Sequence, residues 1–279
     1  MYKPHYVLYG ILWVLALEGT AAVVSTPQSW RPTWHTAVRL VVVLFVLLYL
    51  RMVDEQKDLD YDRIHNPDRP LVTGAVTATD LRIAMAVIAA GSVSASAALS
   101  FGSAVMIASV LAYGLGLWGI EAMSRPIRDN ILLNLVVTYP VQLLVTAYVV
   151  VSAVQTGEAE LRWQSFAIAA IFAGAFLQFE FARKTSKVVR PDEMYYSNFL
   201  GSGGAVAAGL VFAGVAVLVN LVVMPLDRVL VWIPVLLLAF PVWGAAKYLR
   251  TERVDYPLLP PVLFIVTLYS VLIAQALVL

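Results

Sequence analysis

Residues 34–74 read WHTAVRLVVVLFVLLYLRMVDEQKDLDYDRIHNPDRPLVTG. The first half, residues 34–53, is a mostly apolar run of about 20 residues, the length that an α-helix needs to cross roughly 30 Å of hydrocarbon. The second half concentrates charge, with six acidic residues: Asp54, Glu55, Asp58, Asp60, Asp62 and Asp68. The stretch therefore predicts a membrane-spanning helix that ends in a strongly acidic segment at one face of the membrane.

The composition indicates that lipid surrounds most of the chain. Of its 279 residues, 61% are hydrophobic and only 13% are charged, whereas about 25% of the residues of a soluble domain are charged. The apolar residues come in long runs, and the mean hydropathy is +0.81. The formal net charge of +1 gives no reason to expect nucleic acid as a partner. Because the chain has no cysteine, disulfides, thiol nucleophiles and zinc–cysteine sites are excluded.

Apolar runs of spanning length occur at nine positions. We therefore predict an all-α, polytopic membrane bundle of nine transmembrane helices, folded as a single domain over residues 1–279. Pro234 and Pro241 predict a kink in the eighth run, and the two residues that join the third and fourth runs, Phe101 and Gly102, predict a tight hairpin. The runs are 6–25, 34–53, 79–100, 103–122, 130–152, 163–183, 200–223, 228–247 and 257–279.

The distribution of lysine and arginine predicts the orientation of the bundle. With nine spans, the N-terminus shares a side with the loops after the second, fourth, sixth and eighth spans, and that side carries 15 of the 19 basic residues. We therefore expect the N-terminus and the charged loops on the cytoplasmic side of the cell membrane. The same side carries 14 of the 18 acidic residues, which is expected of a polar site that binds a metal and a polyanion together.

Asp54, Asp58 and Asp62 recur every four residues, so on a helix they would line up on a single face, one turn above another. Carboxylates held that close repel one another and raise each other's pKa unless a cation lies among them. Three oxygen ligands at the end of a membrane-spanning helix suit Mg2+ that carries a phosphorylated substrate. Glu55 lies one position off this face. The alternative is a solvated helix end, where charged residues are ordinary.

The segment from His65 to Gly74 contains two prolines and a terminal glycine, which end the helix and form a turn. Arg69 is thereby presented near the acidic residues, where its guanidinium would bind phosphate oxygens bidentately. The alternative is that Arg69 only sets the topology. Arg128, before the fifth span, has the same two interpretations.

A second charged cluster follows the sixth span. Glu180 lies near the end of an apolar helix, and Lys184 and Lys187 share its face. An acid surrounded by cations would complete a metal–diphosphate site; alternatively, the cluster is a set of salt bridges that neutralise one another. Asp192 and Glu193 form a further acidic pair, but a proline places them outside the same helix.

These motifs resemble those of the UbiA superfamily of intramembrane prenyltransferases. The first motif of the superfamily, N/D-D/E-x-x-D-x-x-x-D at the end of the second helix, is similar to residues 54–62, and its N-x-x-R-P-L-x-x-G is matched by residues 66–74. The resemblance implies a helical bundle around a central cavity, with two acidic motifs facing each other across its cytoplasmic mouth. These motifs would hold Mg2+ and the diphosphate of an isoprenoid, whose tail would lie in the cavity.

The resemblance also implies roles for single residues: Asp54, Asp58 and Asp62 as metal ligands and Arg69 as a diphosphate contact. Together with the local patterns, it gives the expected catalytic and metal-binding residues as Asp54, Asp58, Asp62 and Glu180, followed as metal ligands by Glu55, Asp192 and Glu193. The expected diphosphate-binding residues are Arg69, Arg128, Lys184 and Lys187. The chain departs from the superfamily at the second motif, where Asp-x-x-x-Asp is replaced by Glu180-x-x-x-Lys184. Either Lys184 would replace a metal by direct charge, or one of the later acids would fold back into the site.

The reaction that the resemblance implies first is a Mg2+-dependent transfer of an isoprenoid group from a prenyl diphosphate to a lipophilic acceptor, of which an aromatic one is expected. The alternative on the same scaffold is a terpene cyclase that needs no acceptor, which the altered second motif favours. A third interpretation is a non-catalytic membrane protein such as a transporter, which should carry ionisable groups deep in several spans. Neither nucleic acid nor an obligate protein partner is expected.

Overall fold

The computed structural model describes residues 4–26, 29–191 and 193–278, which are mostly helical and include no β-strand. Among these residues, nine helical segments are long and apolar enough to cross a membrane, judged by length and composition. They confirm the expected all-α bundle and its nine spans, and they indicate an integral membrane protein. In chain order the helices are α1 (Pro4–Ser25), α2 (Trp34–Lys57), α3 (Leu59–His65), α4 (Ala78–Leu99), α5 (Phe101–Met123), α6 (Arg125–Asp129), α7 (Ile131–Thr138), α8 (Pro140–Gln155), α9 (Trp163–Arg183), α10 (Tyr196–Val223), the 3-10 helix η1 (Val229–Trp232), α11 (Ile233–Leu237), α12 (Ala239–Arg250) and α13 (Leu259–Val278).

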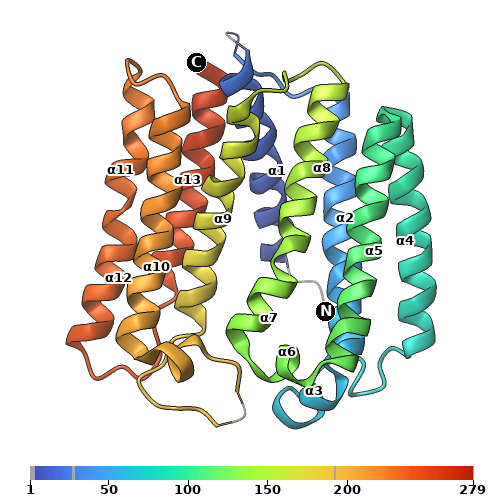
Figure 1. Ribbon diagram of the computed structural model, residues 1–279, viewed down its shortest axis with the longest axis vertical. Helices are drawn as coiled ribbons and strands as arrows, with labels where there is room; N and C mark the ends of the chain where they lie inside the picture. Colours follow the sequence, from blue (N-terminus) through green and yellow to red (C-terminus); the bar gives the residue numbers. More distant parts are fainter. Residues whose placement is uncertain (1–3, 27–28, 192, 279) are drawn as a thin grey trace.

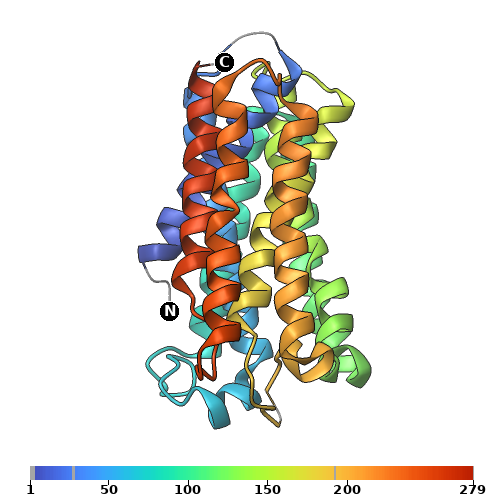
Figure 2. The ribbon, with the colours of Figure 1, turned by 90° about the vertical axis from the view of Figure 1, so that its left-hand side faces the viewer.

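The long helices run side by side between two ends of the bundle (Figures 1 and 2). Helices α2, α4, α5 and α8 form one half, and α10 to α13 form the other (Figure 1). Between the halves, α1 packs against α2, α8, α9 and α13, while α9 packs against α10. The short helices α3 and α6 lie at the same end as the loop between α9 and α10 (Figure 1). We call this end, formed by residues 54–74, 121–130, 180–191, 193–195 and 247–258, the charged end.

Two spans are interrupted at prolines. The kink expected in the eighth run is confirmed, because Pro234 lies in α11 and Pro241 in the separate helix α12. The fifth span, expected to be one continuous helix over residues 130–152, is instead divided at Tyr139 into α7 and α8. Pro140 begins α8 and has no N–H for the carbonyl four residues earlier, so the helical hydrogen bonding is interrupted there.

The third and fourth spans form the expected tight hairpin, with a small correction to the residues that make it. Phe101 and Gly102 belong to α5, and only Ser100 separates α5 from α4. Ser100 has an extended backbone, and its hydroxyl accepts a hydrogen bond from the Ser103 amide at 3.0 Å. This N-terminal cap satisfies one of the free amides of the new helix, which explains why α5 begins immediately after the turn.

A glycine allows α9 and α10 to approach closely. A Cβ atom at Gly174 would lie 2.5 Å from the carbonyl oxygen of Phe212 and 2.9 Å from the amide nitrogen of Ala216. Any larger residue would push the two helices apart. Because helix association inside lipid depends on close packing, such contacts hold a membrane bundle together. The contact fixes α9, which carries Glu180 at the charged end, against α10.

A buried ionic network joins α1, α2 and the end of α8 at the end of the bundle opposite the charged end. Glu18 and Arg39 are both fully buried, and the Nε atom of Arg39 lies 2.8 Å from Oε2 of Glu18. Glu18 also accepts a hydrogen bond from the Thr36 hydroxyl at 2.6 Å. Arg39 donates to the Thr156 hydroxyl at 2.8 Å and lies 3.3 Å from Glu158. The network therefore gives both buried charges partners from neighbouring helices, as buried ions require.

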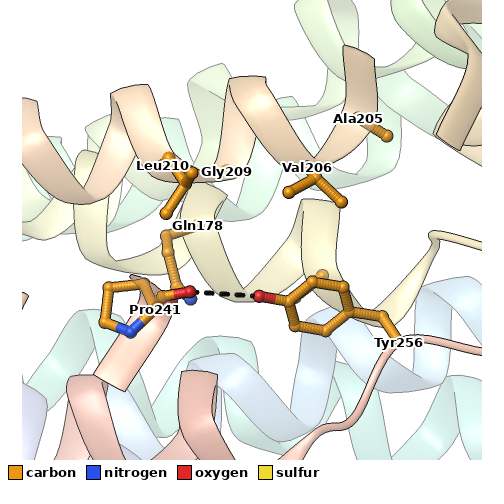
Figure 3. Close-up of a pocket in the computed structure, with 8 residues that line it drawn as sticks. Gln178, Ala205, Val206, Gly209, Leu210, Pro241 and Tyr256 are labelled. Atoms are coloured by element: carbon orange, nitrogen blue, oxygen red, sulfur yellow. Dashed lines mark hydrogen bonds between the residues drawn. The ribbon is translucent and has the colours of Figure 1, made fainter. Parts of the chain in front are cut away.

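Figure 3 shows a small pocket among α9, α10 and α12. Its volume is about 10 Å3, which is about the space that one water molecule occupies. Gln178 and Val206 line it, and at its edge the Tyr256 hydroxyl donates to the Pro241 carbonyl at 3.4 Å. This pocket is too small for an isoprenoid chain. The central cavity implied by the resemblance therefore stays a prediction.

Candidate functional site

The acidic residues that follow α2 do not lie on one continuous helix. α2 ends at Lys57 and α3 begins at Leu59, and Asp58 between them has φ −94° and ψ 13°. The backbone bonds from Asp58 to Asp54 and from Asp62 to Asp58 are retained at 2.9 and 2.8 Å. Aspartate is a poor helix former, and like charges four residues apart destabilise a helix. The expected uninterrupted ladder of three aspartates is therefore corrected to two groups.

The first group is Asp54 and Asp58, whose carboxylates are open to solvent. Their side chains are 47% and 44% exposed, and Oδ1 of each lies 3.7 Å from Nζ of Lys57. The pKa of Asp58 is raised from 3.8 to about 6, chiefly by burial; the charge of Lys57 lowers it, and the negative charges of Asp54 and Glu121 contribute to the increase. The two aspartates thus form an accessible pair at the charged end whose negative charges repel each other.

Glu121, at the end of α5, belongs to the same group, although the sequence analysis did not select it. Its side chain is 6% exposed, and its carboxylate accepts a hydrogen bond from Lys57 at 3.0 Å. One signal was available in the sequence, because Glu121 is an ionisable residue within an apolar span, and such residues are commonly functional. Its proximity to Lys57 depends on how α5 packs against α2, which no local pattern reveals.

The second group is formed by Asp62, Glu55 and Arg69. Asp62 is buried, accepts a hydrogen bond from Asn66 at 2.7 Å and lies 3.8 Å from Nε of Arg69. Glu55 is almost completely buried and accepts hydrogen bonds from Arg69 at 2.7 Å and from Arg51 at 2.8 Å. The structure therefore places Arg69 beside the acidic residues, 30% exposed and held by two carboxylates.

The interaction with two arginines gives Glu55 a structural role in the described arrangement. Its carboxylate oxygen Oε1 accepts from both guanidinium groups, and charge-assisted bonds of this kind are among the strongest in proteins. Its other oxygen, Oε2, is buried and has no hydrogen-bond partner among the described residues. Through Oε1, Glu55 fixes the direction of Arg69 at the charged end, where the guanidinium has further donors for an anion.

Glu180 is neutralised by its own helix. The carboxylate is buried and interacts with Arg183 at 2.9 Å and with Lys184 at 3.0 Å. The ammonium group of Lys184 also lies 5.6 Å from the ring centre of Tyr196. This arrangement is the self-neutralising cluster that the sequence left open as an alternative. A role of Glu180 as a metal ligand would require these two cations to move.

The loop that follows α9 is joined to the loop before α13 by hydrogen bonds from two of the basic residues of the first loop. Lys187 donates to the Thr251 carbonyl at 2.6 Å. Arg190 binds both carboxylate oxygens of Asp255, at 2.6 and 2.8 Å. Lys187, expected to contact diphosphate, is thus held against the loop before α13.

The remaining candidates are Arg128, Glu193 and Asp192. Arg128 is half-exposed and lies 3.5 Å from Asp129. Glu193 lines a pocket of about 180 Å3 between the starts of α7 and α10. Its negative charge also acts on Tyr61 in α3: burial first and then the charge of Glu193 raise the pKa of Tyr61. Asp192 lies outside the described residues.

The accessible carboxylates fit a magnesium ion that is shared with a phosphorylated ligand. Within the described ranges, no group of three or more His, Asp or Glu side chains is spaced to hold a metal ion by itself. Mg2+ in phosphate-binding sites, however, takes one or two carboxylates and completes its octahedron with water and phosphate oxygens. Asp54 and Asp58 supply two such carboxylates, and the repulsion between their negative charges would be relieved by a divalent cation.

Solved structures show what the chain is similar to. It resembles the apo structure of a UbiA homologue from Aeropyrum pernix K1, with a TM-score of 0.67 and 16% identity over 100% of this chain and 98% of that chain. It also resembles a UbiA homologue from Archaeoglobus fulgidus bound to DMAPP and Mg2+, with a TM-score of 0.65 and 15% identity over 98% and 94% of the two chains. A structure of a UbiA homologue from Archaeoglobus fulgidus bound to GPP and Mg2+ has a TM-score of 0.59 and 16% identity over 99% of this chain and 98% of that chain.

Neither a protein-family model nor a curated protein matches the sequence. At identities of 15% and 16% the structural similarity shows the fold. The chain therefore has the fold of the UbiA homologues, and the resemblance inferred from residues 54–74 is confirmed at that level.

Proposed function

We propose that this chain, which has the fold of the UbiA homologues, is a UbiA-type enzyme that uses a prenyl diphosphate with Mg2+. The observation that carries the proposal is the open carboxylate pair of Asp54 and Asp58 at the same end of the bundle as Arg69, an arginine that two buried acids hold in place. Two structures of UbiA homologues from Archaeoglobus fulgidus with this fold contain a prenyl diphosphate, DMAPP or GPP, together with Mg2+. The charged end would accordingly receive the diphosphate.

Each residue of the site has a distinct task in this proposal. Asp54 and Asp58 would hold the metal, and Asp62 helps to position Arg69 through the contact between them. Arg69 binds diphosphate oxygens and helps to neutralise the charge that develops on the leaving group. Mg2+, when bound, supplies further neutralisation of that charge. The apolar helices exclude water from the allylic cation that forms when the C–O bond breaks.

The basic residues of α6 and α9 have secondary places in the proposal. Arg128 and Lys184 would extend the diphosphate site, and Lys187 would join them only after leaving the Thr251 carbonyl. Glu180 would ligate a metal only after its two cations have moved. Glu55 and Glu193 are further acids of the same end, and Asp192 is proposed as a further ligand from the sequence alone. The charged end would face the cytoplasm, as the distribution of lysine and arginine predicts.

The acceptor distinguishes two reactions. We propose first a prenyltransferase that moves the isoprenoid to a lipophilic, aromatic acceptor. A terpene cyclase, in which the allylic cation is attacked by a double bond of the same chain, is the second candidate. It is favoured by the pairing of Glu180 with Arg183 and Lys184, which leaves the second motif without a free carboxylate. Neither reaction requires a side-chain nucleophile.

Purified protein with Mg2+ and one of geranyl, farnesyl or geranylgeranyl diphosphate tests the proposal. Release of diphosphate that depends on Mg2+ and stops with a chelator is the expected result. Product that forms only after an aromatic acceptor is added identifies a transferase, whereas cyclic hydrocarbon or alcohol without acceptor identifies a cyclase. Inertness with all three diphosphates, with and without acceptor, would contradict the proposal and favour a non-catalytic membrane protein.

Divalent-ion binding should weaken in acid because Asp58 is protonated there. The pKa of Asp58 is raised to about 6, so its protonated fraction grows as the pH falls through that value, and a proton competes with the metal. We expect the dissociation constant for Mn2+ to rise by about tenfold for each pH unit below 6 and to level off above 7. Titrations at pH 5, 6 and 7.5 measure this. Asp60→Asn, at an exposed acid, should leave the profile unchanged; a flat profile in the unmodified protein would exclude Asp58 as a ligand.

A further inference from the structure

Lys57 lies among three carboxylates of the candidate site. It is the last residue of α2, and its side chain is only 14% exposed. Its Nζ atom lies 3.0 Å from Glu121 and 3.7 Å from each of Asp54 and Asp58. One ammonium group thus faces two acids of the α2 end and one acid of α5. Nothing in the proposed function so far uses Lys57 or Glu121.

The three distances differ in their physical meaning. At 3.0 Å the ammonium donates a hydrogen bond to Glu121, whereas 3.7 Å to the two aspartates exceeds hydrogen-bond length. Asp54 and Asp58 therefore feel the positive charge while their oxygens stay available to another ligand. Glu121 is 6% exposed and is contributed by a different helix, so it holds the ammonium beside the aspartates.

A cation held in this position changes what the aspartates bind. One ammonium and three carboxylates leave an excess of two negative charges, enough for one divalent ion and too few to favour two. A divalent ion bound by Asp54 and Asp58 would meet the positive charge of Lys57 a few ångströms away. Lysine also has a flexible stem and a compact charge, so the ammonium is able to move when another cation or an anion arrives.

We propose that Lys57 is the resident counter-ion of the Asp54–Asp58 pair, positioned by Glu121, and that it competes with the divalent ion for that pair. The proposal rests on the proposed function, which assigns these aspartates to the metal. Lys57 is in this view a positioning residue: it keeps the two carboxylates together before the metal binds and weakens the binding of the metal alone. A diphosphate, which attracts both cations, would remove the competition.

The competing interpretation is a structural cross-link. The hydrogen bond from Lys57 to Glu121 joins α2 to α5, and this alone would stabilise the bundle. The two interpretations predict different measurements. A cross-link changes thermal stability when it is removed and leaves the affinity for divalent ions as it was. A counter-ion increases that affinity when it is removed, because three carboxylates lose their resident positive charge.

Titration of the detergent-purified full chain with Mn2+ tests the proposal, with free Mn2+ followed by its paramagnetic resonance and no diphosphate present. Lys57→Met and Lys57→Gln should bind Mn2+ about tenfold more tightly than the unmodified protein, the effect expected for removing one charge about 5 Å from a divalent ion in a water-like medium. Lys57→Arg keeps the charge and should stay within about threefold. Lys247→Met, at a lysine whose ammonium lies 5.6 Å from the ring centre of Trp243, is the matched control and should not change the affinity.

Unchanged or weaker Mn2+ binding in folded Lys57→Gln or Lys57→Met would overturn the proposal and leave the cross-link. Should Lys57→Met fail to fold, Lys57→Gln still offers an N–H donor to Glu121, and the Mn2+ affinity of that variant tests the proposal. Absence of saturable Mn2+ binding in every variant would overturn both this proposal and the metal assignment on which it rests. Failure of the prenyl diphosphate assay with normal Mn2+ titrations would count against the reaction and leave the counter-ion proposal intact.

Discussion

Asp58→Asn should lower diphosphate release from a prenyl diphosphate by about a thousandfold without unfolding the protein, because a metal ligand at the leaving group contributes several kcal/mol of transition-state stabilisation. Asparagine has the shape of aspartate and lacks its charge, so it is a poor ligand for Mg2+. Asp58 is 44% exposed and lies outside hydrogen-bond range of Lys57. Its replacement therefore removes little from the packing of the bundle, and the loss would belong to the chemistry.

Asp60→Asn is the matched control for this prediction. Asp60 is two residues away in the same acidic segment, but its side chain is 95% exposed and pairs with Arg63 at the surface. Exposed pairs of this kind contribute at most about 1 kcal/mol to stability. Both variants should elute as the unmodified protein does in size-exclusion chromatography. If Asp58→Asn keeps more than a tenth of the diphosphate release, Asp58 is not a ligand of the catalytic metal.

The second large effect is expected far from the charged end. Arg39→Met should destabilise the protein by about 3–5 kcal/mol, the usual consequence of leaving one member of a buried ion pair without its partner. Glu18 and Arg39 are fully buried and lie 2.8 Å apart. Without the guanidinium, the Glu18 carboxylate keeps only the neutral donors of Thr36 and Trp30 inside a membrane bundle. At roughly 2–4 °C of melting temperature per kcal/mol for a chain of this size, the melting temperature in detergent should fall by about 10 °C.

A double variant separates this cause from simple loss of packing. Glu18→Gln combined with Arg39→Met removes both charges, and well-packed neutral replacements of a buried pair are often tolerated. The double variant should therefore recover most of the loss in melting temperature. Arg162→Met, at an exposed arginine that pairs with Glu160, is the surface control and should change little. If Arg39→Met melts like the unmodified protein, or the double variant melts lower still, the pair does not stabilise the bundle in this way.

The spans could be predicted from the sequence because lipid imposes a simple requirement. A segment that crosses hydrocarbon must be apolar over about 20 residues and must satisfy its backbone hydrogen bonds within a helix. Residues 34–53, for example, were expected as a span and form most of α2. The break at Tyr139 was missed although Pro140 stood in the sequence. That prediction gave more weight to the length of the apolar run than to the missing N–H of the proline. In the structure the run is helical over almost all of its length, with a break that the proline causes.

The candidate site was predicted only in part. The acidic residues after α2 and the turn that presents Arg69 follow from local spacing, and the structure places Arg69 beside Asp62. The placement of Glu121 next to Lys57 depends on the contact between α5 and α2, two helices that are separated in the chain by α3 and α4. The pairing of Glu180 with Arg183 and Lys184 was one of two open alternatives, because the spacing allows both and only the conformation selects one.

The order of apolar and charged segments along the chain is enough to predict a helical membrane protein with a candidate acidic site at one end. The reason is that the free energy of transfer from water to lipid depends on the composition of each segment separately. Which acids stay open to a ligand, which are already satisfied by arginine, and which lysine lies among them are set by helix packing. Ionic contacts depend on distances of a few ångströms between side chains of different helices, and those distances exist only once the helices have assembled.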